Sequence, residues 1–311
     1  MKLAKSIVSK EGNYMGSVKR FLNDRRHVPY ILLTPFILFF LIFRLWPIIW
    51  SFAISFFNYN GVEAEFIGLQ NYISLFQNST FRTSIWNTIF FVIVYNIIML
   101  FLAILLAVIV SSKGIHGRKF FRSVYFIPIA MTLPVVSIVF DMLFANNVGL
   151  VRAICDLLGK EYELRWFADV NLAMWGIIIM RIWRNAGYFC AYFLAGLTGI
   201  SDEYYEAAAI DGSGPIKTFF KITLPLLKPT LLYVMVMSMI QSFQLFDEAW
   251  ILTKGGPANR TLTMQIFLYK TSFLEGEISE GAAVAYVMTI LMMALSIIYV
   301  RGLSEKEVSR G

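Results

Sequence analysis

The hydrophobic positions of this chain are concentrated in six long stretches that hold few ionisable side chains. Each stretch exceeds twenty residues, and a helix that rises 1.5 Å per residue needs about twenty residues to cross the roughly 30 Å hydrocarbon core of a membrane. The pattern therefore predicts an all-α integral membrane protein with six transmembrane helices. The predicted spans are residues 30–57, 85–111, 121–144, 172–198, 224–246 and 280–300.

Prolines interrupt two of these stretches. The first span is long for a single crossing, so we expect it to tilt or to bend at Pro47. Pro128 and Pro134 break the third span, and neighbouring helices usually satisfy the carbonyl groups that such kinks release. The connection 145–171, which holds Trp166, is predicted to lie on the outer side.

The composition agrees with a membrane protein and excludes several other classes. Hydrophobic residues make up 58% of the chain and charged residues 15%, whereas soluble proteins carry about 25% charge. This excludes an ordinary cytosolic enzyme or a secreted domain. The two cysteines lack CxxC spacing, so neither a disulfide framework nor a zinc site is expected. The sequence also lacks the G-x-x-x-x-G-K-[ST] phosphate loop, so we expect no nucleotide hydrolysis by that route.

The positive charges indicate how the chain is oriented in the membrane. With the predicted spans, 17 lysines and arginines fall on the side of the termini and 7 on the opposite side. Cytoplasmic loops carry the excess of basic residues, so both termini are predicted to be cytoplasmic. We expect a basic tail over 1–29, a six-span domain over 30–300 and a second tail over 301–311. The net charge of +7 lies mostly in the first tail, which indicates contact with the lipid bilayer and not with nucleic acid.

The loop 199–225 is the most informative part of the sequence. Ser201 is a favourable N-cap, two acidic residues and three alanines follow it, and Gly212 is a typical helix stop. Gly214-Pro215 then restarts a helix. The loop is therefore predicted to form two short helices joined at an angle. Its alanines could fit a groove of another protein, with Glu206 as a charged anchor, or the helices could pack on their own bundle.

The same loop carries a resemblance to a known family. It resembles the EAA signature of permease subunits of binding-protein-dependent ABC importers, with Ser213 where alanine is usual. The matching residues are Glu206-Ala207-Ala208-Ala209-Ile210-Asp211-Gly212-Ser213 and Ile222-Thr223-Leu224-Pro225-Leu226-Leu227-Lys228-Pro229. Over residues 30–300 the chain is similar to the carbohydrate-uptake branch, which includes maltose-type and glycerol-phosphate-type permeases. Weaker supporting segments are Phe66-Ile67-Gly68-Leu69-Gln70-Asn71-Tyr72, Leu194-Ala195-Gly196-Leu197 and Thr253-Lys254-Gly255-Gly256-Pro257.

The resemblance implies a non-catalytic transport subunit in a prokaryotic plasma membrane. Its expected partners are two ATPase subunits, which would use ATP and Mg, an extracellular solute-binding protein and a second six-span permease. The resemblance favours a non-identical second permease, and the sequence alone does not decide between that and a homodimer. No cofactor is expected in this chain. The resemblance assigns ATPase coupling to Glu206, Ala207, Ala208, Asp211, Gly212, Leu224 and Pro225.

Polar residues inside the predicted spans are candidates for a substrate path. Arg181 lies about nine residues into the fourth span, which places it about 14 Å deep. An arginine that faces lipid there costs at least about 2.5–3.5 kcal/mol, so we expect its helix face to turn toward protein or water. Arginine, amide and tyrosine groups on facing helices would suit a polyhydroxylated solute or, because there are two arginines, a carboxylated or phosphorylated one. The candidates are Tyr95, Asn96, Arg181, Arg184, Asn185, Tyr188, Gln241 and Gln244.

Other interpretations of these polar residues remain open. Amide and arginine side chains often join helices in membrane bundles, so the candidates could be interhelical links. A secondary transporter driven by an ion gradient is the alternative function, although such carriers usually have carboxylates at the midplane and internal repeats. Asp141, Asp247 and Glu248 lie toward the ends of spans, and no repeat is apparent. A structural or assembly protein would leave the 199–225 signature unexplained.

Overall fold

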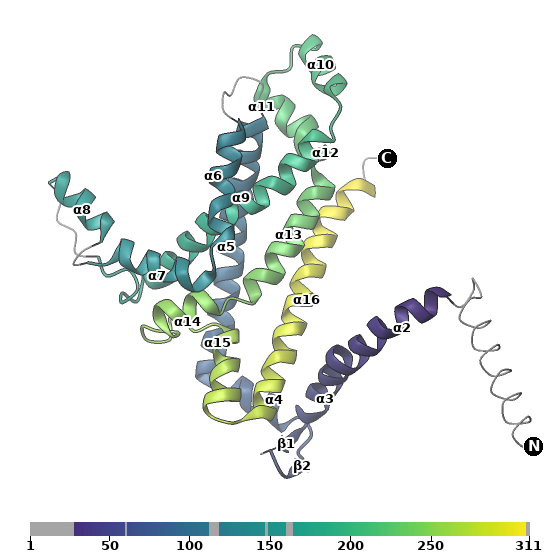
Figure 1. Cartoon of the computed structure of the whole chain (residues 1–311), viewed down its shortest axis with the longest axis vertical. Coiled ribbons are helices and arrows are strands. Elements are labelled where there is room, and N and C mark those ends of the chain that lie inside the picture. The colour runs from purple at the N-terminus through teal and green to yellow at the C-terminus, as the bar shows by residue number, and fades with distance from the viewer. Residues whose placement is uncertain (1–27, 60, 112–117, 147–148, 160–163, 309–311) are drawn as a thin grey trace, which may run out of the picture.

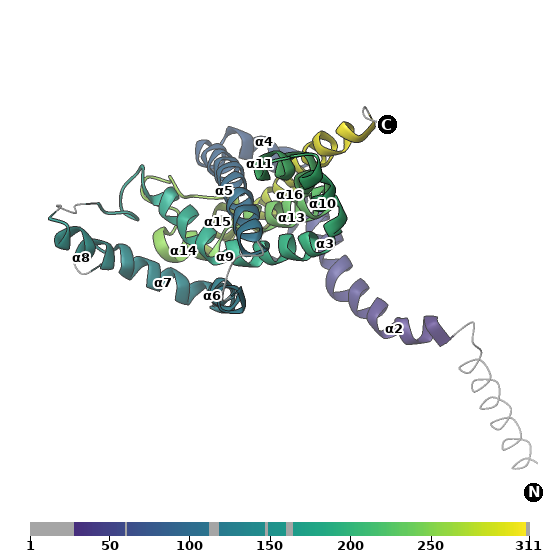
Figure 2. The ribbon, with the colours of Figure 1, turned by 90° about the horizontal axis from the view of Figure 1, so that it is seen from above.

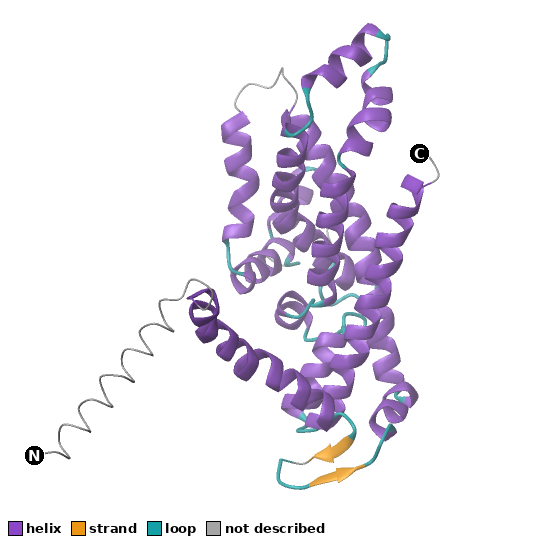
Figure 3. Ribbon diagram, turned by 90° about the vertical axis from the view of Figure 1, so that its right-hand side faces the viewer, coloured by secondary structure: helices purple, strands orange, loops and turns teal. Residues whose placement is uncertain are grey.

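The computed structural model describes residues 28–59, 61–111, 118–146, 149–159 and 164–308. Most of this part of the chain is helical, and its long helices form an elongated bundle (Figure 1). A two-stranded antiparallel sheet pairs β1 Phe57–Tyr59 with β2 Ala64–Phe66. The predicted helical architecture is confirmed, and this short ribbon lies at one end of the bundle (Figure 3).

The bundle is built from four long helices. They are α5 Ser79–Ser111, α9 Ala173–Thr198, α13 Lys228–Phe243 and α16 Ile278–Val308. The main hydrophobic core lies between them and includes Phe91, Tyr95, Ile177 and Phe193. This packing positions the polar residues of α9 against α5 and α13.

Shorter elements connect and flank these helices. Among the described residues they are α2 Val28–Phe40, η1 Leu41–Leu45, α3 Trp46–Ile54, α4 Gln70–Gln77, α6 Arg118–Ala130, α7 Leu133–Phe144, α8 Leu150–Leu157, α10 Asp202–Ile210, α11 Pro215–Thr218, η2 Phe219–Thr223, α12 Leu224–Leu226, α14 Asp247–Thr253, α15 Met264–Tyr269 and η3 Lys270–Leu274, where η marks a π-helix.

The first predicted span forms an arm that projects from the bundle. Helix α2 leaves the bundle on the side opposite to α7 and α8 (Figures 1 and 2). The helical geometry of the arm changes in the π-helix η1, before Pro47, which occupies the first turn of α3. Large apolar side chains of the arm are exposed, for example Phe36 at 69% and Trp46 at 61%. Its surface therefore requires lipid or another protein around it.

The described residues contain four helical segments that are long and apolar enough to cross a membrane. They are Leu32–Ile54, Ser79–Ser111, Lys228–Thr253 and Ile278–Gly302. Helices α6 and α7 together form a fifth candidate, bent by 111° at the break between them. Helix α9 covers the predicted fourth span, but Arg181, Arg184 and Asn185 make it less apolar. The number of six spans stays a prediction.

A close contact between α6 and α9 fixes the position of the bent pair. A Cβ atom added to Gly187 would lie 1.9 Å from the carbonyl oxygen of Tyr125. Only glycine leaves room for two backbones at this separation, because real Cβ atoms do not approach a carbonyl oxygen so closely. Gly187 therefore sets the distance between α6 and α9.

The structure describes only part of the two predicted terminal tails. Residues 1–27 of the N-terminal tail are outside the described residues. Helix α16 continues through Val308, into the tail predicted over 301–311, and residues 309–311 are outside the description.

Candidate functional site

The 199–225 loop forms the two short helices that its sequence predicts. Helix α10 begins after Ser201, whose side chain accepts a hydrogen bond from the backbone N–H of Glu203 at 3.4 Å. Two acidic residues occupy the first turn, where the helix dipole stabilises negative charge. The N-terminal signal read from the sequence is therefore confirmed.

Helix α10 ends in a Schellman turn at Gly212. The backbone N–H of Ser213 donates to the carbonyl of Ala208 at 2.8 Å, and that of Gly212 donates to the carbonyl of Ala209 at 3.1 Å. Gly212 has φ +68°, a left-handed conformation that glycine adopts without the steric cost of a Cβ atom. The turn reverses the chain so that Pro215 can begin α11.

The second half of the loop is more irregular than predicted. Helix α11 has only four residues and continues directly into the π-helix η2, which leads through α12 into α13. The hydroxyl groups of Tyr205 and Thr223 lie 3.3 Å apart and connect α10 to η2. The loop is therefore a helical hairpin with a hydrogen bond between its two sides.

The tip of this hairpin lies away from the bundle. Figure 1 places α10 at the end of the molecule opposite to the β-ribbon. Ile210 is 86% exposed and Ile216 is 74% exposed, which leaves apolar side chains available to a partner. Of the seven residues assigned to coupling, Glu206, Ala207, Asp211, Gly212 and Pro225 are exposed, Leu224 is half-buried and Ala208 is buried. Their role in ATPase coupling stays a prediction.

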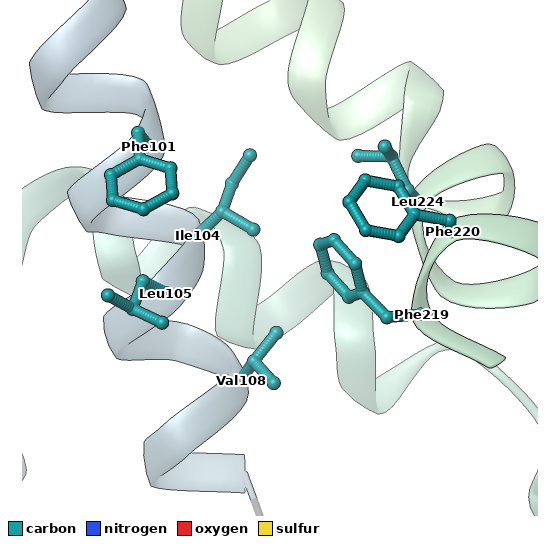
Figure 4. Close-up of a pocket in the computed structure, with 7 residues that line it drawn as sticks. All are labelled: Phe101, Ile104, Leu105, Val108, Phe219, Phe220 and Leu224. Atoms are coloured by element: carbon teal, nitrogen blue, oxygen red, sulfur yellow. The ribbon is translucent and has the colours of Figure 1, made fainter. Parts of the chain in front are cut away.

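An apolar cleft separates this hairpin from α5. It has a volume of 330 Å³ and is lined by Phe101, Ile104, Leu105, Val108, Phe219, Phe220 and Leu224 (Figure 4). Since none of these side chains carries a hydrogen-bonding group, the cleft offers nothing to orient a polar solute. This cleft therefore does not match the polar substrate path that the sequence predicts.

The polar residues of the spans meet at one place, where α9 faces α5, α13 and α14. Arg181 is 7% exposed, and one of its terminal nitrogens lies 2.7 Å from a carboxylate oxygen of Glu248. Its other terminal nitrogen donates to the carbonyl oxygen of Gln241 at 2.7 Å. The guanidinium also lies 5.9 Å and 5.7 Å from the ring centroids of Phe91 and Tyr95. The expectation that Arg181 turns inward is confirmed.

Two further sets of hydrogen bonds link the same helices. Asn185 donates to the Tyr95 hydroxyl at 3.0 Å, which links α9 to α5. Asn96 donates to the Ser242 hydroxyl at 2.9 Å and accepts a hydrogen bond from Ser238 at 2.5 Å, which links α5 to α13. Four of the candidates, Tyr95, Asn96, Arg181 and Asn185, are thus buried and joined across helices.

The remaining candidates lie at the margin of this cluster. Arg184 donates to the side chain of Asn185 and to the carbonyl of Met131, which sits at the break between α6 and α7, both at 3.3 Å. The Tyr188 and Tyr192 hydroxyls lie 2.9 Å apart. The Gln241 side chain is half-buried, and Gln244 is exposed. Whether these residues contact substrate stays a prediction.

Glu248, the partner of Arg181, was not predicted as a site residue from the sequence. The helical pattern places Glu248 in a polar strip with Gln241 and Gln244 but pairs it with no base. The sequence does contain a signal that could have identified this pair, namely an acidic residue next to an apolar stretch. A buried charge needs an opposite charge near it, so Glu248 could have been expected to pair with a base. In the structure, the α13–α14 break turns Glu248 toward α9. Among the described residues, no three His, Cys, Asp or Glu side chains form a metal-ligand group.

Comparison with known proteins identifies the family. The family described as "Binding-protein-dependent transport system inner membrane component" matches residues 99–309. This chain belongs to that family. It is the permease subunit of a binding-protein-dependent ABC importer, as the EAA-like signature in the 199–225 loop indicates. Family membership does not favour the alternative of an ion-coupled secondary transporter.

Curated relatives match nearly the whole chain. The arabinooligosaccharides transport system permease protein AraP of Bacillus subtilis (strain 168) is 36% identical over 277 residues, which cover 88% of this chain and 88% of the relative. The lactose transport system permease protein LacF of Rhizobium radiobacter is 33% identical, covering 86% and 91%. The sn-glycerol-3-phosphate transport system permease protein UgpA of Yersinia pestis bv. Antiqua (strain Antiqua) is 29% identical, covering 90% and 95%.

The fold is also found among solved structures. A bacterial ABC transporter involved in the import of the acidic polysaccharide alginate aligns with a TM-score of 0.79 at 19% identity. The alignment covers 94% of this chain and 99% of that chain. A second structure, of the bacterial alginate transporter in complex with an alginate pentasaccharide-bound periplasmic protein, aligns at 20% identity with the same coverage and TM-score. These likenesses confirm an ABC permease fold.

Proposed function

We propose that this chain forms half of the translocation path for a saccharide in an ATP-driven importer. The observation that carries the proposal is the helical hairpin of residues 199–225. Its tip is exposed, its turn is fixed by Gly212, and its exposed isoleucines can enter a groove on an ATPase subunit. Closure of two ATPase subunits on ATP would move two such hairpins together and open the path outward.

The saccharide assignment is supported by the relatives and by the chemistry of the spans. Two of the relatives are permeases for arabinooligosaccharides and lactose. At the margin of the Arg181 cluster, the half-buried Gln241, Tyr188 and Tyr192 offer amide and hydroxyl groups together with aromatic rings. A sugar ring needs both kinds of contact, because its hydroxyls form hydrogen bonds while its C–H faces pack on aromatic rings. The Arg181–Glu248 pair adds no net charge to the cluster, whereas Arg184 at its margin adds one positive charge.

The complete transporter requires other chains. We propose a second six-span permease that is not identical to this one, two ATPase subunits that use ATP and Mg, and an extracellular binding protein that delivers the solute. We place the protein in the prokaryotic plasma membrane. The proposed topology has six spans, both termini in the cytoplasm and the 199–225 hairpin on the cytoplasmic face. The outward state is reached only if ATP and the docked binding protein both prefer it.

The test combines one variant with a matched control on the same helix. Glu206→Ala removes the proposed charged anchor, whereas Glu203→Ala changes another exposed acid of α10. We expect Glu206→Ala to insert and to assemble with the second permease but to lower uptake of labelled arabinotriose and lactose several-fold, with less ATPase recovered in the purified complex. Glu203→Ala should behave as the parent protein. Normal uptake and normal ATPase recovery in Glu206→Ala would refute the coupling role.

A further inference from the structure

A polar pocket lies beside the Arg181 cluster but does not include its residues. It occurs where the end of α7, the segment before α9 and helix α14 come together, and its volume is 290 Å³. This is close to the lower limit of ligand-binding pockets, which span about 300–1,000 Å³. The residues that define its chemistry are Asp141, Phe144, Asn146, Arg165, Trp166 and Leu252.

Two buried polar atoms distinguish this pocket from an ordinary surface hollow. Trp166 Nε1, a donor, and Asn146 Oδ1, an acceptor, have no hydrogen-bond partner within the described part of the chain. Leaving such buried atoms unpaired destabilises a fold, so each normally has a partner. A hydroxyl group both accepts and donates, and neighbouring hydroxyls on one ligand could therefore satisfy both atoms.

The walls of the pocket combine apolar and charged groups. The Trp166 ring packs on Phe144 at 4.7 Å between centroids, which holds the indole in place. Asp141 and Arg165 are exposed, and exposed charges of this kind are costly in hydrocarbon, so this side of the pocket faces water or protein. One acid and one base bring no net charge. An aromatic wall with a few hydrogen-bonding groups and no net charge fits a neutral sugar ring.

The pocket lies next to the Arg181 cluster. Leu252 lies four residues after Glu248 on α14, which is about one helical turn, or about 6 Å. We propose that this pocket is a saccharide subsite, which holds one sugar unit of an oligosaccharide while the other units lie along the translocation path. The subsite rests on the proposed function, and it would make this permease select for chain length.

The experiment uses the complete transporter in proteoliposomes with its binding protein. Arabinotriose with a terminal diazirine is the photoreactive probe, and labelled peptides are mapped after illumination. We expect labelling of the peptide that contains Trp166 and competition by unlabelled arabinotriose. Trp166→Phe keeps an aromatic ring and removes the donor, and Asn146→Ala removes the acceptor. Each should lower labelling and arabinotriose uptake about tenfold, as expected for a lost buried hydrogen bond.

Controls distinguish a subsite at Trp166 from a docking surface and from binding at the Arg181 cluster alone. Trp175→Phe changes a tryptophan on α9 that packs edge-on against Phe90, and it should match the parent protein. Uptake without labelling near Trp166, or labelling confined to the Arg181 cluster, would refute the subsite and leave the proposed function intact. Loss of affinity for the binding protein in Trp166→Phe would show a docking surface and would also refute it. Absence of any saccharide uptake by the parent protein would overturn both proposals.

Discussion

Removing the charge of Glu248 should strongly destabilise the bundle. In Glu248→Gln the side chain keeps nearly the same shape, but the buried guanidinium of Arg181 loses its counter-charge. The two side chains are only 2% and 8% exposed and lie 2.7 Å apart, so water cannot replace the carboxylate. Breaking a buried pair by changing one partner costs about 3–5 kcal/mol. At about 2 °C per kcal/mol for a large domain, the midpoint of thermal unfolding should fall by about 6–10 °C.

The assay is thermal unfolding of the purified transporter in detergent, followed by tryptophan fluorescence. Asp247→Asn is the matched control, because Asp247 is the neighbouring acid and is exposed; its midpoint should stay within about 1 °C of the parent protein. The double variant Arg181→Met/Glu248→Leu should recover most of the loss, since apolar replacements of a buried pair are often neutral. A Glu248→Gln midpoint equal to that of the parent, or no recovery in the double variant, would contradict the reasoning.

Three further predictions concern single positions. Gly212→Ala should speed hydrogen exchange at the backbone amide of Ser213 about tenfold, because the left-handed conformation costs a non-glycine residue about 1–2 kcal/mol; Gly214→Ala, at negative φ, should not. Gly187→Ala should push α6 away from α9 and destabilise the protein by about 1–3 kcal/mol, which would lower its unfolding midpoint. The control Gly302→Ala has room for the added methyl group and should leave the midpoint unchanged. Arg181→Ala should slow saccharide uptake while the affinity of the binding protein, measured separately, stays unchanged; an unaltered uptake rate would contradict a role of Arg181 in transport.

Elements with local signals were predicted well from sequence. Helix α9 was expected over 172–198 and occupies Ala173–Thr198, because its apolar stretch has clear polar limits. The 199–225 hairpin begins and turns at the predicted residues because a cap and a left-handed glycine act within a few positions of the chain. The second span was predicted to begin at residue 85, whereas helix α5 begins at Ser79. Its first turns are polar, so the apolar pattern does not reveal them. Their start is marked only by Asn78, whose side chain accepts a hydrogen bond from the backbone N–H of Thr80.

Features that depend on distant residues were not predicted. The prolines indicated a break between α6 and α7, but the angle of 111° depends on packing against α9. Likewise, the pairing of Arg181 with Glu248 joins positions 67 residues apart, and it requires the chain to turn after α13. Periodicity places a residue on a helix face but does not tell which face of another helix it will meet.

The hairpin of residues 199–225 also has a mechanical consequence. No neighbouring atom lies within 4 Å of a Cβ atom added at Gly212 or Gly214, and the Thr218 hydroxyl joins the tip to α11 by donating to the carbonyls of Ser213 and Gly214. A push applied there reaches the rest of the subunit through two roots, the end of α9 and the start of α13. Between the tip and these roots, the Tyr205–Thr223 hydrogen bond joins α10 to η2, so the two sides of the hairpin would move together.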